Sequence, residues 1–547
     1  MLRSRTAVAG LAAVSVIGLM TACGRSAGNS TTTNGNINPL KGLVTTTAPG
    51  TKQVSSVTWA VYRDVNSLDP IFAFDYPENT AVSLLCESLL RQSPDGAVGP
   101  GLATLSTPSP TKYVLTLKSG VHFWDGNPVT PADVVYSLGR AQSSKLGGFY
   151  TQVFTRVKSI TATGSNQVTI TLNQPDYWLQ GELASMPGIV IEQKFAEAQG
   201  KKYGTPGGSI MCTGAYKYKS FSPGVGVTAV ADPNYWNKDV HPLVGSILIK
   251  GVPDISAFTS GLQTGAISGA FSYALSTLNQ LQSNQNVKVV QGPGWLTDAF
   301  IVSSRSGVLG DVRVRRALSE ALDRSGIVNS VYKGAALMPK WISNPGTFGY
   351  GRSVFNAAYN SAPTIKHDIA GAKKLIQQAG ASGKTLTIGT SSQLADISAV
   401  AGAYQAAAQA IGLKVQLKSV SANNYINFFI DAKARVGIDG FLTVNYGDYA
   451  DPAAMLSTLV LPEGSQNYDK YDNKQIVTLM NQARSTADPD KRAALVVKVE
   501  QLAIKDLPWI PDVQPTSLLL MNKKLSGATA SFAYMFAPWA DHLGGVG

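Results

Sequence analysis

Residues 370–444 alternate between stretches with helical spacing and short strand-like runs. Residues 370–379 and 399–411 carry apolar side chains at helical intervals, whereas 386–388, 415–417 and 441–444 are short apolar runs. Helices and strands that follow one another in this way are typical of α/β domains, in which helices cover a sheet. The sequence therefore predicts an α/β fold.

The length of the chain predicts more than one domain. Its 547 residues exceed what a single hydrophobic core usually supports, so we expect two or three domains. The composition, 44% hydrophobic and 15% charged, is that of a globular protein. The formal net charge is +12, but the Lys and Arg residues are scattered and form no basic block. We therefore expect no nucleic-acid partner.

The first 22 residues have the charge order of a secretory signal peptide. Arg3 and Arg5 precede an apolar run over residues 7–20, which is short for a membrane span. The run ends in Leu-Met-Thr-Ala-Cys, which resembles a bacterial lipobox, so Cys23 is the expected lipidated N-terminus. A plain signal peptide with a chance cysteine is the alternative. Lipid chains would hold the protein at the extracytoplasmic face of the cell membrane without spanning it.

Residues 23–52 are expected to form a flexible tether. They are mostly Ser, Thr, Asn and Gly, and they have almost no periodic apolar content. Such a segment would hold a folded body a short distance from a membrane surface.

Two cysteines remain in the predicted mature chain, Cys86 and Cys212. An exported location permits a disulfide between them. Two buried free thiols are the alternative, and the sequence does not decide between the two.

An acidic turn follows the predicted strand at 441–444. Asp448 lies there between Tyr446 and Tyr449, so a carboxylate is flanked by two amphipathic rings. Open α/β sheets place ligand groups at strand ends, and this arrangement suits a ligand ammonium. The structural alternative is that Asp448 and Asp451 only turn the chain and cap a helix that begins at Pro452.

The sequence gives little support to catalysis. It has no Gly-x-Ser-x-Gly elbow and no phosphate-binding Gly-x-x-x-x-Gly-Lys loop. The four histidines are far apart and form no pair with the spacing of metal ligands. We therefore expect neither an enzyme nor a metal site or cofactor.

Eleven short motifs follow one another along the chain. They are 68–70 (Leu-Asp-Pro), 86–90 (Cys-Glu-Ser-Leu-Leu), 95–96 (Asp-Gly), 101–103 (Gly-Leu-Ala), 120–138, 213–216 (Thr-Gly-Ala-Tyr), 234–236 (Asn-Tyr-Trp), 311–318, 321–324, 448–452 (Asp-Tyr-Ala-Asp-Pro) and 488–492. Together they resemble the extracellular solute-binding proteins of peptide/nickel-type ABC transporters, family 5, over nearly the whole mature chain. By themselves, Arg313, Arg315 and Arg316 belong to a predicted helix and are interpreted as scaffold.

The resemblance implies a type II periplasmic-binding-protein fold. In that fold two α/β lobes are joined by a hinge, and lobe I carries an extra subdomain. The expected divisions are a signal peptide (1–22), the tether (23–52), lobe I (53–78, 191–292 and 506–547), its extra subdomain (79–190) and lobe II (293–505).

The resemblance also implies binding by lobe closure. By analogy with peptide-binding members, Asp448 pairs with the α-ammonium of a peptide. Such a desolvated ion pair is favourable only if the ammonium fills its other hydrogen bonds. The implied partners are the peptide, an ABC permease with its ATPase subunits, and the membrane reached through the lipid anchor. The receptor itself is expected to be a monomer.

Two further residues are candidates for the cleft. Asp64 lies in a segment that approaches the ligand in some relatives, although a solvated turn residue is an equal alternative. Trp295 follows Gly-Pro-Gly and either lines the cleft or packs in the core, with the core favoured.

The sequence departs from the family pattern beside Asp448. Asn445 stands where peptide-binding relatives often have Trp, and Leu442 stands where some have Arg for the ligand carboxylate. Lys433 and Arg435 are candidates for that second role, or else ordinary exposed charges. These departures leave open the same fold with another solute, such as a metal chelate, haem or a glycan. An enzyme or a surface-signalling protein without transport is a third, weaker alternative.

Overall fold

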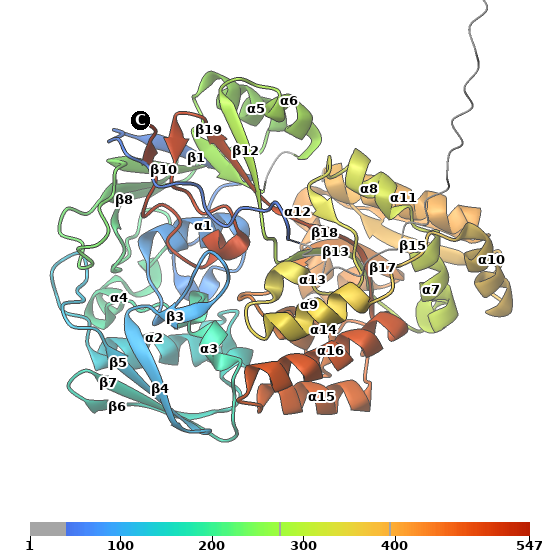
Figure 1. Cartoon of the computed structure of the whole chain (residues 1–547), viewed down its shortest axis with the longest axis horizontal. Coiled ribbons are helices and arrows are strands. Elements are labelled where there is room, and N and C mark those ends of the chain that lie inside the picture. Colours follow the sequence, from blue (N-terminus) through green and yellow to red (C-terminus); the bar gives the residue numbers. More distant parts are fainter. Residues whose placement is uncertain (1–39, 273–274, 393–394) are drawn as a thin grey trace, which may run out of the picture. The chain divides into compact units, whose positions relative to one another are not determined.

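The computed structural model describes residues 40–272, 275–392 and 395–547. Two large mixed sheets and one smaller sheet organise this part of the chain (Figure 1). The predicted helices at 370–379 and 399–411 are α10 (Ile369–Gln378) and α11 (Ala395–Ala410). The strands predicted at 386–388, 415–417 and 441–444 are also present, so the α/β prediction is confirmed.

The first large sheet has seven strands in the order β12-β19-β11-β1-β10-β9-β8. Its strands are β1 (Val57–Val61), β8 (Tyr216–Ser222), β9 (Gly226–Ala231), β10 (Ser246–Gly251), β11 (Gly269–Phe271), β12 (Val287–Gly292) and β19 (Ser517–Asn522). Strand β1 runs parallel to both of its neighbours, and the other pairs are antiparallel. Helix α1 (Tyr76–Leu85) and the turn η10 (Phe532–Met535) contribute to the core on this sheet.

The second large sheet has six strands in the order β14-β18-β13-β17-β15-β16. Its strands are β13 (Leu296–Val302), β14 (Ala336–Leu337), β15 (Thr385–Thr390), β16 (Lys414–Ser419), β17 (Gly440–Tyr446) and β18 (Trp509–Pro515). Two cores lie against it. The helices that contribute to them include α7 (Val312–Ala321), α9 (Arg352–Ser361), α14 (Pro452–Val460), α15 (Lys474–Arg484) and α16 (Pro489–Asp506).

The smaller sheet has four antiparallel strands in the order β4-β5-β7-β6 and its own core. They are β4 (Ala103–Ser109), β5 (Lys112–Leu117), β6 (Val157–Gly164) and β7 (Gln167–Leu172). Helix α2 (Pro131–Gln142) packs on it and begins with a capping box. Thr130 accepts a hydrogen bond from the N–H of Asp133, and the Asp133 carboxylate accepts one from the N–H of Thr130.

The described chain passes between the two large sheets at two points. Residues 293–295 connect β12 to β13, and Thr516 connects β18 to β19. The two connections touch, since a Cβ atom at Gly294 would lie 2.2 Å from the carbonyl oxygen of Pro515. Short paired connections of this kind suit a hinge. The expected return to lobe I at residue 506 comes too early, because β18 pairs with β13 and so belongs to the second sheet.

The described end of the predicted tether is bonded to the folded body. The N–H groups of Val44, Thr47 and Lys52 donate to carbonyl oxygens of residues 291, 528 and 545 at 2.9, 3.1 and 3.1 Å. These residues are held by backbone hydrogen bonds and not by a repeating pattern of apolar side chains. The amino-acid composition therefore did not indicate that the segment is bonded to the folded body. The tether prediction therefore does not hold for residues 44–52, while residues 1–39, Cys23 included, lie outside the described residues.

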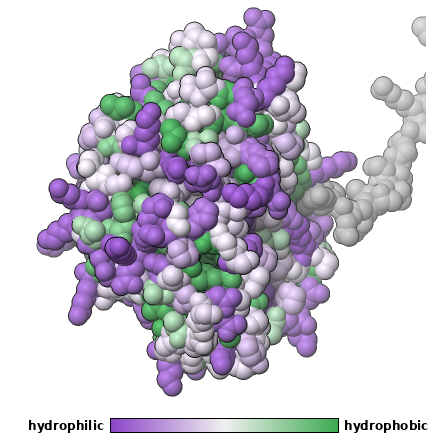
Figure 2. Space-filling view, turned by 90° about the vertical axis from the view of Figure 1, so that its left-hand side faces the viewer, coloured by the Kyte–Doolittle hydropathy of each residue, from purple (hydrophilic) through white to green (hydrophobic). Residues whose placement is uncertain are grey.

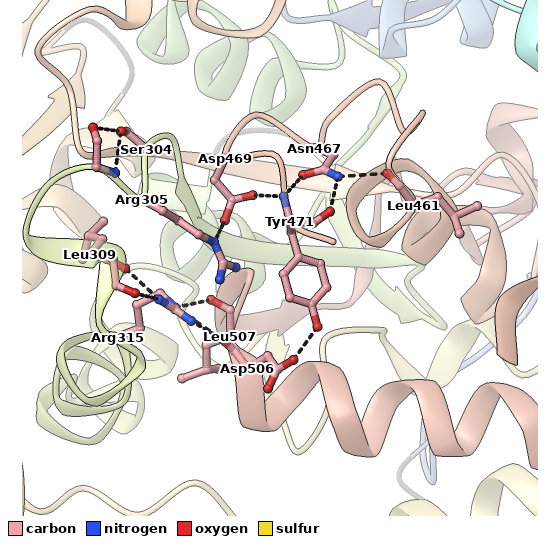
Figure 3. Close-up of polar contacts among 12 residues, drawn as sticks. Ser304, Arg305, Leu309, Arg315, Leu461, Asn467, Asp469, Tyr471, Asp506 and Leu507 are labelled. Atoms are coloured by element: carbon pink, nitrogen blue, oxygen red, sulfur yellow. Dashed lines mark hydrogen bonds and ion pairs between the residues drawn. The ribbon is translucent and has the colours of Figure 1, made fainter. Parts of the chain in front are cut away.

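One of the three arginines of the 311–318 motif, Arg315, is scaffold (Figure 3). Arg315 is buried in α7 and donates to the carbonyl oxygens of Leu309, Leu507 and Asp506 at 2.7, 3.0 and 2.6 Å. The Asp506 carboxylate in turn accepts a hydrogen bond from the Tyr471 hydroxyl at 2.6 Å. These contacts satisfy carbonyl groups at the C-terminal end of α16, so the motif stabilises the fold.

Cys86 and Cys212 are joined by a disulfide that links the end of α1 to the segment before β8. Nearby, the buried Glu87 accepts hydrogen bonds from Thr213, Tyr235 and Trp236. These contacts place three of the sequence motifs in one structural cluster.

The face of the molecule drawn in Figure 2 is largely polar. Figure 2 shows that hydrophilic side chains surround small, separate hydrophobic patches on one face of the molecule. Within the described ranges, no helix has the length and apolarity needed to cross a bilayer.

Candidate ligand-binding site

The residues after β17 form the centre of the candidate site. The strand ends at Tyr446, and α14 begins at Pro452. Asp451 caps this helix, because its carboxylate accepts the N–H of Ala453 at 2.8 Å. The capping interpretation therefore holds for Asp451. It does not account for Asp448, which makes no such contact.

The carboxylate of Asp448 has no protein partner among the described residues. Neither side-chain oxygen accepts a hydrogen bond, and no Lys or Arg forms an ion pair with it. Its withdrawal from water raises the pKa of Asp448 to about 6. The backbone carbonyl of Asp448 is held by the amide of Gln92, whose Nε2 donates to it at 2.9 Å.

A second carboxylate, that of Glu182, lies near Asp448. It ends the short helix α3 (Leu179–Glu182), which belongs to the segment after the smaller sheet. Gly181 lies directly on the ring of Tyr449, since a Cβ atom at 181 would be 2.2 Å from Cδ2 of that ring. Oε2 of Glu182 is closed to solvent and has no partner. Burial, and then the charge of Asp448, raise the pKa of Glu182 well above its ordinary range.

Gln92 joins the segments that carry these two acids. It is 1% exposed and belongs to β2 (Leu90–Gln92). Its Nε2 donates both to the carbonyl oxygen of Ala184 at 3.3 Å and to that of Asp448 at 2.9 Å. Its Oε1 is buried and without a partner. Sequence reasoning missed both Gln92 and Glu182, because neither lies in a pattern that marks a binding residue.

Aromatic rings surround the acids. The Tyr446 hydroxyl donates to the carbonyl oxygen of Phe74 at 2.6 Å, and its ring lies 5.4 Å from that of Tyr76 and 5.2 Å from that of Phe532. Tyr446, at the end of a strand of the second sheet, therefore contacts elements that pack against the first sheet. Tyr449 is buried in the core, beside Gly181.

Tyr150 lies close enough to both acids for their charges to raise its pKa. Its hydroxyl donates to the carbonyl oxygen of Ala73, and its ring is buried. Burial first, and then the charges of Asp448 and Glu182, raise the pKa of Tyr150 well above its ordinary range. Both carboxylates thus act on the same phenol.

The cation near these acids is already paired. Arg484 of α15 donates from Nε and Nη2 to the two carboxylate oxygens of Asp176 at 2.8 and 2.5 Å. Its guanidinium also lies 5.2 Å from the ring of Trp178. Because Arg484 is paired with Asp176, it forms no ion pair with Asp448 or Glu182.

The other predicted site residues make structural contacts. Asp64 is exposed, and its carboxylate accepts the N–H of Gly224 in the turn between β8 and β9 at 3.1 Å. Asn445 donates to Oε1 of Gln466 at 2.7 Å. Trp295, in the first connection between the sheets, is buried with its ring stacked on that of Phe536 at 6.0 Å. These contacts correspond to the turn interpretation of Asp64 and the core interpretation of Trp295.

Of the residues considered for binding a ligand carboxylate, Leu442 and Arg435 make contacts within the protein. Leu442 is fully buried in the core of the second sheet. Arg435 donates to the carbonyl oxygen of Phe428 at 2.7 Å and lies 4.5 Å from the ring of Tyr468. Lys433 is exposed.

A surface cavity of about 500 Å³ lies beside Gln92. It is lined by residues 91–94, residues 97–100 and parts of the C-terminal segment 527–542, together with Thr46. The ion pair between Arg91 and Asp541, 2.5 Å long, forms part of its wall. Elsewhere in the described chain, no group of three or more His, Cys, Asp or Glu side chains is arranged to hold a metal ion.

The model of the bacterial extracellular solute-binding proteins, family 5, matches residues 97–467. The chain belongs to this family. A probable di/tripeptide-binding protein of Pseudomonas aeruginosa is 24% identical over 480 residues, which cover 82% of this chain and 88% of that protein.

Two solved structures of similar fold contain different ligands, a peptide in one and a nickel–histidine complex in the other. DppA from Helicobacter pylori, in complex with the peptide STSA, gives a TM-score of 0.75 at 21% identity and covers 89% of this chain and 98% of its own. NikA from Staphylococcus aureus, in complex with Ni(L-His)2, gives 0.73 at 19% identity, with 88% and 98% covered. The predicted type II fold, with two α/β lobes, is confirmed.

Proposed function

We propose that the protein is a lipid-anchored receptor that captures peptides between its two lobes and delivers them to a membrane permease driven by ATPase subunits. Asp448 carries this proposal. Its backbone carbonyl is bonded to Gln92 of the other lobe, and its carboxylate lies in partly dry surroundings with no protein cation to neutralise it. A peptide α-ammonium is the group that such a carboxylate binds best.

Membership of the family supports transport, since its members are extracellular solute-binding proteins. The relative from P. aeruginosa is named as a di/tripeptide-binding protein, and the DppA structure contains a tetrapeptide. In this function, residues 293–295 and Thr516 act as the hinge, and a peptide that contacts both lobes favours the closed form. The receptor works as a monomer on the extracytoplasmic face, held there by a lipid on Cys23.

Isothermal titration with a library of tri- to pentapeptides tests the ligand class. We expect free-amine peptides to bind wild type, and Asp448→Ala to weaken binding, while Asp64→Asn, which changes an exposed turn carboxylate, leaves it unchanged. Equal binding of free-amine and N-acetylated peptides would contradict the role of Asp448. Native mass spectrometry that finds a metal chelate, haem or glycan, and no peptide, would favour the non-peptide alternative.

The anchor has a separate test. The variant Cys23→Ser should move the protein from the membrane fraction to the soluble extracytoplasmic fraction without changing peptide affinity. Retention in the membrane fraction would exclude a lipid on Cys23.

A further inference from the structure

We infer that Glu182 and Gln92 complete, together with Asp448, a three-acceptor site for a primary ammonium group. The inference rests on the proposed function, in which Asp448 receives the peptide terminus. It adds that the segment after the smaller sheet supplies a second carboxylate, so that both sides of the cleft bind the same nitrogen.

The unpaired acceptors beside Asp448 match the donors of a primary ammonium group. A primary ammonium has three N–H donors, and burying it is favourable only when all three find acceptors. The Asp448 carboxylate, Oε2 of Glu182 and Oε1 of Gln92 are three acceptors without a partner in the described chain. Oε2 of Glu182 and Oε1 of Gln92 are buried, and a buried acceptor left unpaired is costly, so these two groups call for a donor from outside the protein.

The segments that carry Asp448 and Glu182 are bonded and packed together. The Gln92 amide bonds the carbonyl oxygens of Ala184 and Asp448, and Ala184 lies two residues after Glu182. On the other side, Gly181 packs on the ring of Tyr449, which directly follows Asp448. Two independent contacts thus hold the segments of the two acids together.

The charges near Asp448 and Glu182 favour a cationic ligand group. The titratable groups around the two acids are Tyr150, Asp176, Tyr446, Tyr449 and Arg484. Four of them are phenols or a carboxyl group, and the one cation, Arg484, is paired with Asp176. The site is therefore negative and lacks a counter-ion from these neighbours. It favours a cation and disfavours a neutral or anionic group.

The site also predicts proton release on binding. Without ligand, two nearby acids in dry surroundings keep a proton near neutral pH, in keeping with the raised pKa values of Asp448 and Glu182. When an ammonium enters, both acids become carboxylates and the proton passes to the buffer. Binding heats measured at pH 6.5 should therefore depend on the ionisation enthalpy of the buffer.

The test uses the tightest library peptide in four forms: with a free amine, N-methylated, N,N-dimethylated and N-acetylated. Wild type should prefer them in that order, because each methyl group removes a donor and acetylation removes the charge. Loss of a hydrogen bond to a charged group corresponds to about 10- to 100-fold in affinity. Glu182→Gln should weaken the free-amine form by that factor and reduce the preference over the N-methylated form. The control, Glu197→Gln, changes an exposed carboxylate on α4 (Gln193–Gln199) and should change neither.

Each outcome separates the inference from the proposed function. If Asp448→Asn abolishes preference for the free amine while Glu182→Gln binds like wild type, the inference fails and the proposed function stands. If wild type binds the free-amine and N-acetylated forms alike, both fail. Should Glu182→Gln not fold, the methylation series on wild type still decides, because equal affinity for the first three forms overturns the three-acceptor site.

Discussion

The ion pair between Asp176 and Arg484 joins the segment after the smaller sheet to helix α15 of the second lobe. Arg484→Gln removes the guanidinium and leaves the Asp176 carboxylate, which is 0% exposed, without its bidentate partner. The lobes can relieve that cost by parting, because an open cleft lets water reach Asp176. We therefore expect this substitution to oppose closure more than folding.

The size of the effect follows from burial. Removing one partner of a buried ion pair costs about 3–5 kcal/mol, which corresponds to about two to four powers of ten in the affinity of a ligand that requires closure. The pair between Asp95 and Arg352 serves as a control. Its side chains are 49% and 45% exposed and its atoms are 3.2 Å apart, so Arg352→Gln should cost at most about 1 kcal/mol.

Isothermal titration with the tightest library peptide measures the change in Kd for each variant, and denaturant unfolding measures the free energy of folding in parallel. Arg484→Gln should weaken binding at least tenfold more than Arg352→Gln, while Asp176→Asn combined with Arg484→Gln should recover part of the loss, because it removes the unpaired charge. An affinity within twofold of wild type for Arg484→Gln would refute the argument.

Three further predictions concern acid, the disulfide and Trp295. Because the pKa of Asp448 is about 6, lowering the pH through 6 protonates the acid, and peptide Kd should rise about tenfold per unit below that value; a Kd that is constant from pH 7 to 4.5 would contradict this. Replacing Cys86 and Cys212 by Ala opens a loop of 126 residues and should lower the free energy of unfolding by up to about 5 kcal/mol, measured in urea against the oxidised wild type; no change would contradict it. Trp295→Ala should lower the free energy of unfolding by about 3–5 kcal/mol, because the ring is in the core; unchanged stability with lost peptide binding would instead make Trp295 a ligand contact.

Local patterns in the sequence predict local structure well. The helical spacing at 370–379 and the strand run at 441–444 depend on neighbouring residues, and the structure contains both of them. The order of the motifs was enough to indicate the family and therefore the two-lobed fold.

Contacts between distant segments could not be predicted in the same way. Gln92 and Asp448 are 356 positions apart, and Glu182 belongs to a third segment, so no periodicity links them. For the same reason the sequence did not show that the chain returns to the first lobe only after β18. The pairing of β18 with β13, a distant strand, places β18 in the second sheet. Asn445 was likewise interpreted from the sequence as a residue that changes the ligand cleft. In the structure its side chain bonds to Gln466, which is 21 positions further along the chain.

The role of Asp448 is decided by a crystal structure of the protein with the tightest library peptide. We expect the peptide's terminal nitrogen to lie within hydrogen-bond distance of the Asp448 carboxylate, between the two lobes. A peptide nitrogen that faces open solvent, or a ligand bound only in the cavity beside residues 91–100, would contradict it.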